Sequence, residues 1–177
     1  MKKQLLTMVF ILCAVCAEAQ VIWNVKAGAG VSGIQDRVDF AWTAGVGAEI
    51  PVSNNWVFLP SFQYAHKKVG HMFNSGGENG EFLQLPIQMG YNVKLSGLNK
   101  LVVKAGPYAA YSMTTLSAAS FDVGVDVGID YIWKHYVLGI DYQNGFINLT
   151  REHFYGGSYD YDYGRATAAF LTFGYRF

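Results

Sequence analysis

Three features of the sequence predict an all-β protein, an eight-stranded antiparallel up-and-down transmembrane barrel. The first is a recurring pattern of about ten residues in which every second side chain is apolar, as in strands with one face in lipid. The second is composition: 15% of the residues are charged and 16% are aromatic, whereas soluble domains carry about 25% charged residues. The third is that no segment beyond the N-terminus holds 18 consecutive apolar residues. Only strands closed into a barrel then satisfy the backbone in lipid.

The segment Phe121–Trp133 shows the pattern most clearly. Its odd positions are large and apolar, and its even positions include Asp122, Gly124, Asp126, Gly128 and Asp130. Successive side chains of a strand point to opposite faces. One face of this strand is therefore apolar, and the other is small and acidic. We expect lipid against the first face and the barrel interior behind the second.

Seven further segments repeat this alternation, and none carries a charged residue on its apolar face. In chain order the eight predicted strands cover Trp23–Ser32, Trp42–Ile50, Trp56–Tyr64, Leu83–Val93, Leu101–Tyr111, Phe121–Trp133, Tyr136–Gly145 and Ala169–Phe177.

The composition of the two faces justifies each strand in turn. The first two alternate Trp, Val, Ala and Ile with mainly glycine and short polar residues. The third and fourth set larger Phe, Leu, Ile, Met and Tyr side chains against Ser and Gln. The fifth and seventh place Lys104 and Asp141 opposite their apolar faces, and the eighth ends in alternate aromatic residues from Phe173 to Phe177. Small polar residues suit the crowded interior of a narrow barrel.

The connections alternate in length along the chain. Short turns are predicted at 53–55, 96–99 and 134–135, and long connections at about 33–41, 67–80, 113–120 and 149–164. Short periplasmic turns and longer outer loops are typical of outer-membrane barrels, so both ends of the barrel chain are expected on the periplasmic side. Interfacial aromatic girdles are then predicted, with Trp23, Trp56, Trp133 and Phe177 at the periplasmic rim and Trp42 at the outer rim.

Residues 1–19 are predicted to be a signal peptide, followed by a barrel domain over residues 20–177. Lys2 and Lys3 precede an apolar run that ends at the A-x-A site Ala17–Ala19. A membrane anchor and a lipoprotein signal are the alternatives, the second because Cys13 and Cys16 lie in this region. Since both cysteines precede the cleavage site, we expect no disulfide or thiol ligand in the mature protein.

A secreted lipocalin-like barrel is the soluble alternative, because it also has eight antiparallel strands, with the apolar face turned inward. Its water-facing side would be rich in Lys and Glu, whereas the polar face here is mainly Gly, Ser, Thr, Asn and Gln. The membrane-spanning interpretation is therefore favoured. Thirteen basic and thirteen acidic residues leave no net charge, so no nucleic-acid partner is predicted.

The charged residues of the polar faces are the principal candidate site. They are predicted to form a lumen charge network of Lys26, Glu49, Lys104, Asp122, Asp126, Asp130, Asp141 and Arg176. Buried charges must be paired or hydrogen-bonded, and side chains fill the interior of an eight-stranded barrel. We expect a plug of ion pairs; an ion path is the alternative.

The last long connection holds the candidate surface-contact residues Tyr155, Tyr159, Tyr161 and Tyr163. Exposed tyrosines provide amphipathic contact area at low entropy cost. A solvated hairpin extension is the simpler interpretation of this segment. Its alternating aspartates suggest calcium, but the spacing does not match an EF-hand loop.

No cofactor, metal or enzyme activity is predicted. His66, His71, His135 and His153 fall at or beyond strand ends without metal-ligand spacing. His66, Ser75 and Glu78 or Glu81 would be the only hydrolase-like set near the outer rim, and no nucleophile motif supports it.

Several stretches resemble the PorT-like outer-membrane β-barrel family typical of Bacteroidota. They are Phe82–Ile87, Lys104–Tyr108, Phe121–Gly124 with Val127–Gly128, Asn144–Leu149 and the terminal Tyr175–Phe177. The last is similar to the aromatic end that the outer-membrane assembly machinery reads. The resemblance implies a barrel in the outer membrane, and the founding members are linked to a secretion system.

These observations predict a small monomeric outer-membrane barrel with a structural or surface-contact role. The alternative is an accessory component of an outer-membrane secretion or assembly system. Expected partners are outer-membrane lipid, the assembly machinery and an envelope or surface protein.

Overall fold

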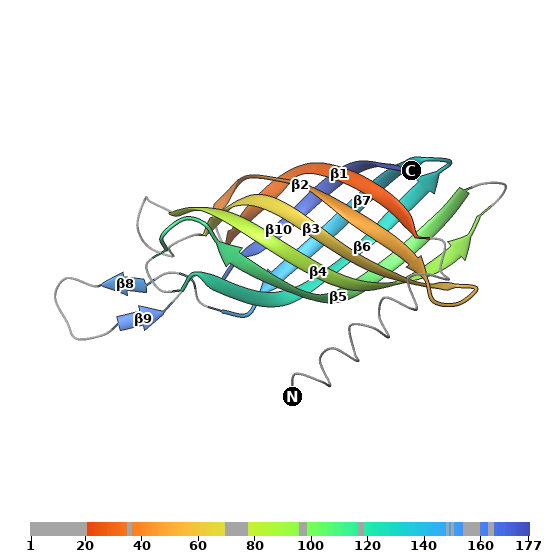
Figure 1. The fold of residues 1–177 in the computed structure, drawn as a ribbon. Coiled ribbons are helices and arrows are strands. Elements are labelled where there is room, and N and C mark those ends of the chain that lie inside the picture. Colours follow the sequence, from red (N-terminus) through yellow and green to blue (C-terminus); the bar gives the residue numbers. More distant parts are fainter. Residues whose placement is uncertain are drawn as a thin grey trace, which may run out of the picture.

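The computed structural model describes residues 21–34, 37–69, 78–95, 99–116, 119–147, 149, 151–153, 160–162 and 165–177. Among these residues, eight long strands form one closed barrel (Figure 1). They are β1 (Ile22–Ile34), β2 (Arg37–Pro51), β3 (Trp56–Val69), β4 (Glu78–Lys94), β5 (Asn99–Ser112), β6 (Phe121–Trp133), β7 (Tyr136–Gly145) and β10 (Thr167–Arg176). The predicted signal peptide lies outside the described residues.

The barrel strands are antiparallel neighbours in chain order, so the topology is up-and-down. β1 closes the barrel against β10, in register from Asn24–Arg176 to Ser32–Ala168. Within the described residues, no helix is long and apolar enough to cross a bilayer. Closure pairs the backbone groups of both terminal strands, which a sheet in lipid requires. The predicted eight-stranded antiparallel barrel is confirmed.

Side chains alternate between the outer wall and the interior as the sequence predicts. In β6, Val127 is 42% exposed on the outside, while its neighbour Asp126 is 2% exposed in the lumen. The same alternation runs along β7 and β10. The outer wall is therefore apolar, and the charges of these strands lie inside.

Two predicted connections are shorter in the structure than the sequence suggests. Pairing of β1 with β2 continues to Ile34–Arg37, so the predicted long connection 33–41 is wrong. β3 and β4 pair as far as Val69–Glu78, so the residues at both ends of the predicted connection 67–80 belong to the strands. About 9–11 residues suffice to cross a bilayer, whereas β4 has 17. The apolar alternation ends where a strand leaves lipid, but backbone pairing continues beyond that point.

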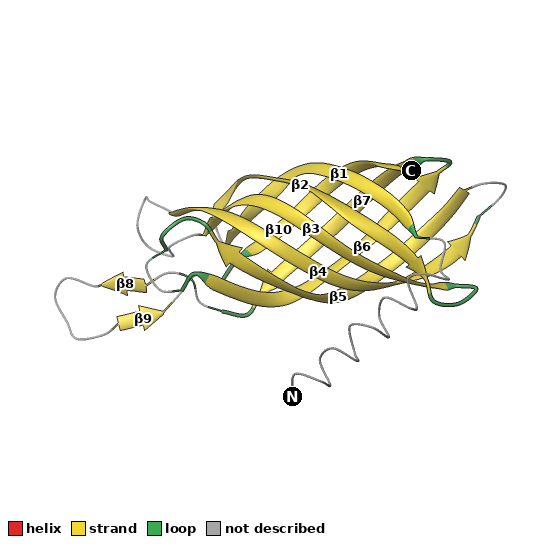
Figure 2. Ribbon diagram, in the orientation of Figure 1, coloured by secondary structure: helices red, strands yellow, loops and turns green. Residues whose placement is uncertain are grey.

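The last connection also contains regular structure. β8 (Arg151–His153) pairs with β9 (Asp160–Asp162) in a small two-stranded sheet apart from the barrel (Figure 2). The hairpin considered from the sequence is therefore present as the pairing of β8 with β9.

The core lies inside the barrel and has apolar packing near both ends. Near the short turns, Val57, Val102, Ile132 and Val137 pack together, with Leu59 against them. At the opposite end the larger cluster is Phe82, Tyr108, Ala110, Leu116, Leu149 and Ala166. Polar and charged side chains occupy the space between these two clusters.

Candidate functional site: the charged lumen

All eight charged residues predicted for the lumen lie on the inward face of the barrel. Seven of them are buried, and Lys26 is half-buried. They come from six strands. β6 contributes Asp122, Asp126 and Asp130, which are every fourth residue of the strand and therefore share one face. The strand period of two thus places three carboxylates in a row along the barrel interior.

The last carboxylate of the row, Asp130, belongs to an ion-pair cluster. Asp130 binds Lys26 at 2.5 Å and Lys104 at 3.1 Å. Lys104 also binds Asp141 at 2.6 Å, and the Thr172 hydroxyl donates to Asp141 at 3.2 Å. Four strands are therefore tied together through two ammonium and two carboxylate groups. Such pairing offsets the cost of removing these charges from water.

Glycines on neighbouring strands leave room for these carboxylates. Asp130 lies opposite Gly139, and Asp141 lies opposite Gly128, in the β6–β7 register. A Cβ atom added at either glycine would overlap the carboxylate of its partner. The Asp and Gly positions of these two strands are thus complementary, which explains why small and acidic residues alternate on the inward face of β6.

A second ion-pair cluster lies near the short turns. Glu49 binds Lys100 at 2.5 Å and Arg176 at 2.7 Å. Val102 separates Lys100 from Lys104 along the inward face of β5 and belongs to the apolar cluster at this end. The two clusters are therefore separated by apolar side chains. Lys100 was not among the predicted lumen residues, because it precedes the first apolar residue assigned to the fifth strand.

Lys67 is a further buried lumen cation that the sequence analysis placed in a loop. It is 0% exposed, and its ammonium donates to the Gln143 amide oxygen at 2.5 Å. Gln143 in turn donates to Asp126 at 2.9 Å. Lys67 has the same parity as Ser61 and Gln63, and this signal would have placed it on the inward face.

Three aromatic rings lie close to the Lys67 ammonium. The distances from Nζ to the ring centroids are 5.2 Å for Tyr108 and 5.9 Å for both Phe82 and Phe170. Cation–π attraction is strongest for a desolvated ammonium. This part of the lumen therefore holds its cation by one amide and three rings, without a described carboxylate in ion-pair contact.

The end of the barrel opposite the short turns is covered by its own connections. The Tyr108 hydroxyl donates to Asp122 at 2.8 Å, and the Ile147 backbone N–H donates to the same carboxylate at 3.3 Å. Leu116 and Leu149, from two connections, belong to the same apolar cluster as Tyr108. These contacts close the lumen above the carboxylate row.

The described lumen charges balance. The cations are Lys26, Lys67, Lys100, Lys104 and Arg176, and the anions are Glu49, Asp122, Asp126, Asp130 and Asp141. With five charges of each sign, the interior is electrically neutral at neutral pH if all are ionised. The ion pairs form a cross-linked plug: the Asp130 cluster lies between the two apolar clusters, and the Glu49 cluster lies on the short-turn side of Val102.

The predicted aromatic girdle has one clear rim. Trp23, Trp56, Trp133 and Phe177 lie at the short-turn ends of their strands and are 48–70% exposed. Trp42 faces outward from within β2, where its ring lies 5.2 Å from that of Tyr64. The predicted connection 33–41 would place Trp42 at the start of its strand. β2 begins at Arg37 instead, so Trp42 is the sixth residue of the strand.

The remaining candidate residues are only partly covered by the structure. Tyr155, Tyr159 and Tyr163 lie outside the described residues; Tyr161 is in β9, and its side chain is not described. His66 is not at a strand end, since it lies within β3 opposite Glu81, while Ser75 lies outside the described residues.

A closed barrel with an apolar outer wall and paired charges inside defines a small outer-membrane β-barrel protein. Residues 5–177 match the family described as outer membrane protein beta-barrel domain. The chain belongs to this family, and it is located in the outer membrane. No curated protein sequence matches the chain.

Solved structures are similar to the chain at low sequence identity. Neisserial surface protein A, from Neisseria, is 13% identical with a TM-score of 0.53, and the match covers 89% of this chain and 97% of that one. The Yersinia pestis attachment invasion locus protein is 12% identical, with 88% and 98% coverage and a TM-score of 0.47. The N-terminal barrel of Pseudomonas aeruginosa OprF is 14% identical, with 90% and 100% coverage and a TM-score of 0.46.

Proposed function

We propose that this barrel does not conduct solutes and is not an enzyme, and that it acts by presenting its ends to other molecules of the cell envelope. The observation that carries this proposal is the filled lumen. Ion pairs centred on Asp130 and Glu49 occupy the interior, and apolar clusters lie near both ends. A solute would have to separate paired charges and displace packed side chains to pass.

The end with the longer connections is the candidate contact surface. It carries the β8–β9 hairpin (Figure 1) and exposed residues such as Met113, which is 57% exposed. Tyr155, Tyr159, Tyr161 and Tyr163 belong to the same connection as the hairpin. We infer that this end faces outward and that the tyrosines contact a surface protein, because amphipathic rings suit such contacts.

Site-specific crosslinking in intact cells tests the surface-contact role. A photoreactive amino acid at Met113 should yield a discrete crosslinked product in the native membrane. The matched position is Val52, which is 61% exposed on a turn at the other end. Products at Met113 that disappear when residues 154–159 are shortened support the proposal. Products only at Val52 contradict it.

A role as an accessory of a secretion or assembly system is the second candidate. Val52 and Leu95 are exposed apolar residues at the short-turn end, where a periplasmic partner would bind. The resemblance of Phe82–Ile87 and Lys104–Tyr108 to PorT-like barrels supports the same role. Crosslinks from Val52 or Leu95 to an identified envelope component would favour this candidate over surface contact.

We further propose that the protein is secreted with cleavage before Gln20 and is inserted by the outer-membrane assembly machinery as a monomer. The apolar run and the A-x-A site support the cleavage, and the terminal Tyr175–Phe177 supports recognition by that machinery. Mass spectrometry of the mature protein should find Gln20 as the first residue. A different first residue would contradict the assignment.

A further inference from the structure

The hydrogen-bonded wall is interrupted in three adjacent ladders. Pairing of β1 with β2 and of β6 with β7 is continuous. Within the described strands, however, β2–β3 pairing stops at Gly47–Ser61 and resumes at Ile50–Phe58. The β3–β4 ladder skips the two positions between Pro60–Ile87 and Gln63–Gln84, and the β4–β5 ladder skips the two between Pro86–Tyr108 and Met89–Ala105.

One proline lies in each interruption. The register places Pro60 opposite Ala48, Pro86 opposite Ser61 and Pro107 opposite Ile87 at the unpaired positions. Proline has no N–H to donate to a ladder, and it is rare in central strands for this reason. The prolines therefore account for the three interruptions.

An interruption of this kind is costly where the wall lies in lipid. Each missing N–H leaves an acceptor on the neighbouring strand without its ladder donor, and lipid offers no substitute. Buried backbone groups in such positions are commonly satisfied by ordered water. The wall around β3 thus requires a source of hydrogen bonds other than the lipid.

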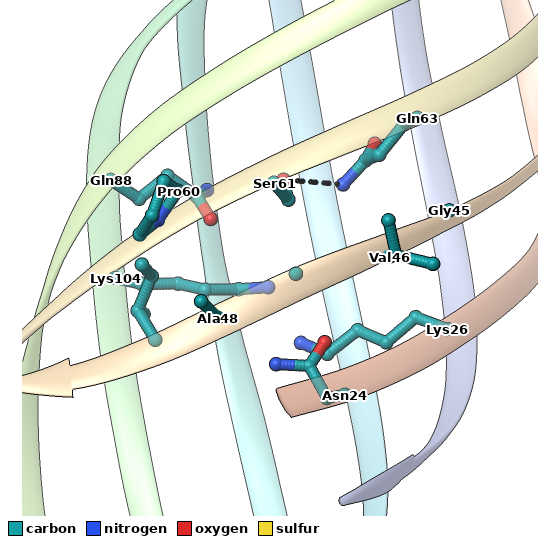
Figure 3. A pocket seen from close by; sticks show the side chains of 12 residues that line it. Asn24, Lys26, Gly45, Val46, Ala48, Pro60, Ser61, Gln63, Gln88 and Lys104 are labelled. Carbon is teal, nitrogen blue, oxygen red and sulfur yellow. Dashed lines mark hydrogen bonds between the residues drawn. The ribbon is translucent and has the colours of Figure 1, made fainter. Parts of the chain in front are cut away.

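A small cavity of about 30 Å³ lies at the β2–β3 interruption (Figure 3). Its lining includes residues that face outward, such as Ala48 and Pro60, and residues that face the lumen, such as Ser61, Gln63 and Lys104. The cavity therefore lies within the wall itself. This volume is above the roughly 10–15 Å³ that one bound water needs.

Polar groups converge on this position from the lumen side. The Gln63 amide donates to the Ser61 hydroxyl at 3.1 Å (Figure 3), and Gln88 also lines the cavity. Asn24 and Lys104 bring further polar groups to its lining. A bound water needs two to four polar partners, which these side chains and the interrupted backbone provide.

We propose that a water molecule bound in the wall between β2 and β3 replaces the interrupted ladder, and that the wall of β3, β4 and β5 opens to solvent before the rest of the barrel. Local opening occurs where few backbone bonds must break. The continuous β6–β7 ladder, with the Asp130 and Asp141 ion pairs above it, is the protected side.

Amide hydrogen exchange of the full barrel in lipid nanodiscs, followed by NMR, tests both parts. We expect the Ala48, Ser61 and Phe62 amides to exchange at least about tenfold faster than those of Ile129 and Ile140. Magnetisation transfer from water should reach the Ser61 and Gln63 signals. Equal protection of both walls, or no transfer from water, would overturn the proposal.

A proline replacement provides the matched comparison. Pro60→Val restores an N–H that can donate to the Ala48 carbonyl. This closes the ladder around Ala48 and should slow exchange of the Ala48 amide by about tenfold. Pro51→Val is the control, because the Pro51–Val57 pair is intact and its replacement should leave Ala48 unchanged. A folded Pro60→Val barrel with unchanged exchange at Ala48 contradicts the proposal. If Pro60→Val does not fold, the wild-type exchange map decides.

Discussion

The carboxylate of Asp130 occupies the space that a side chain on Gly139 would fill. The two residues are opposite each other in the β6–β7 ladder, and a Cβ atom at Gly139 would overlap Asp130 Oδ1 and crowd Thr172 Oγ1. Asp130 is in turn held by Lys26 and Lys104. A glycine on one strand therefore positions the ion-pair cluster of the lumen.

Gly139→Ala should destabilise the folded barrel by about 1–3 kcal/mol, because the added methyl forces Asp130 out of its ion-pair geometry. Reversible urea unfolding from lipid vesicles, followed by tryptophan fluorescence, would measure the free energy of unfolding. Gly47→Ala is the control: its Cβ would first meet the flexible Asn24 side chain, at 3.0 Å. An equal decrease in the free energy of unfolding in both variants would show that the position of Asp130 does not depend on Gly139.

Breaking the central ion pairs should cost far more than breaking a pair at the barrel end. Asp130→Ala leaves Lys26 and Lys104 short of a counter-charge in a buried site, at a cost of about 3–5 kcal/mol. The partly exposed Asp39, 3.2 Å from Lys68, is the comparison, and Asp39→Ala should cost about 0–1 kcal/mol. Similar unfolding free energies for the two variants would mean that the central cluster is hydrated.

Lys67 is expected to behave differently from the paired lysines. It contacts an amide and three aromatic rings, so Lys67→Met keeps the packing and removes the cost of burying a charge. The variant should be neutral or more stable by about 1–4 kcal/mol, as for other buried ionic groups replaced by apolar residues. Lys104→Met removes the ion pairs with Asp130 and Asp141 and should therefore destabilise the folded barrel. A large loss of stability in Lys67→Met would reveal that the charge itself is needed.

The lipid-facing wall can be tested at Val127, which is outward-facing near the middle of β6. Val127→Arg should cost about 2–4 kcal/mol in folding into lipid, as arginine does near the bilayer midplane. Val52→Arg, on an exposed turn, should leave the folding free energy unchanged within about 0.5 kcal/mol. If Val127→Arg folds as well as the wild type, the outer wall of β6 does not face lipid.

The barrel and most of its charged interior could be predicted because lipid imposes an uninterrupted apolar alternation on each strand. The inward position of Asp126 and Asp130 could be predicted from the alternation in β6. That of Lys67 and Lys100 could not, because near the barrel ends the apolar alternation stops before the strand does. The pairings themselves, such as Lys26 with Asp130, 104 residues apart, depend on barrel closure and on register. Sequence alternation alone carries no information on either.

The central claim is that the lumen is filled by paired charges and sealed by the apolar clusters near both ends. Single-channel recording of the refolded wild-type protein in planar lipid bilayers tests it most directly. We predict no stable ohmic conductance under an applied voltage, with Lys104→Ala and Asp126→Ala as variants that loosen the plug. Steady openings of the wild type that these substitutions abolish would contradict the account and identify the carboxylate row as an ion path.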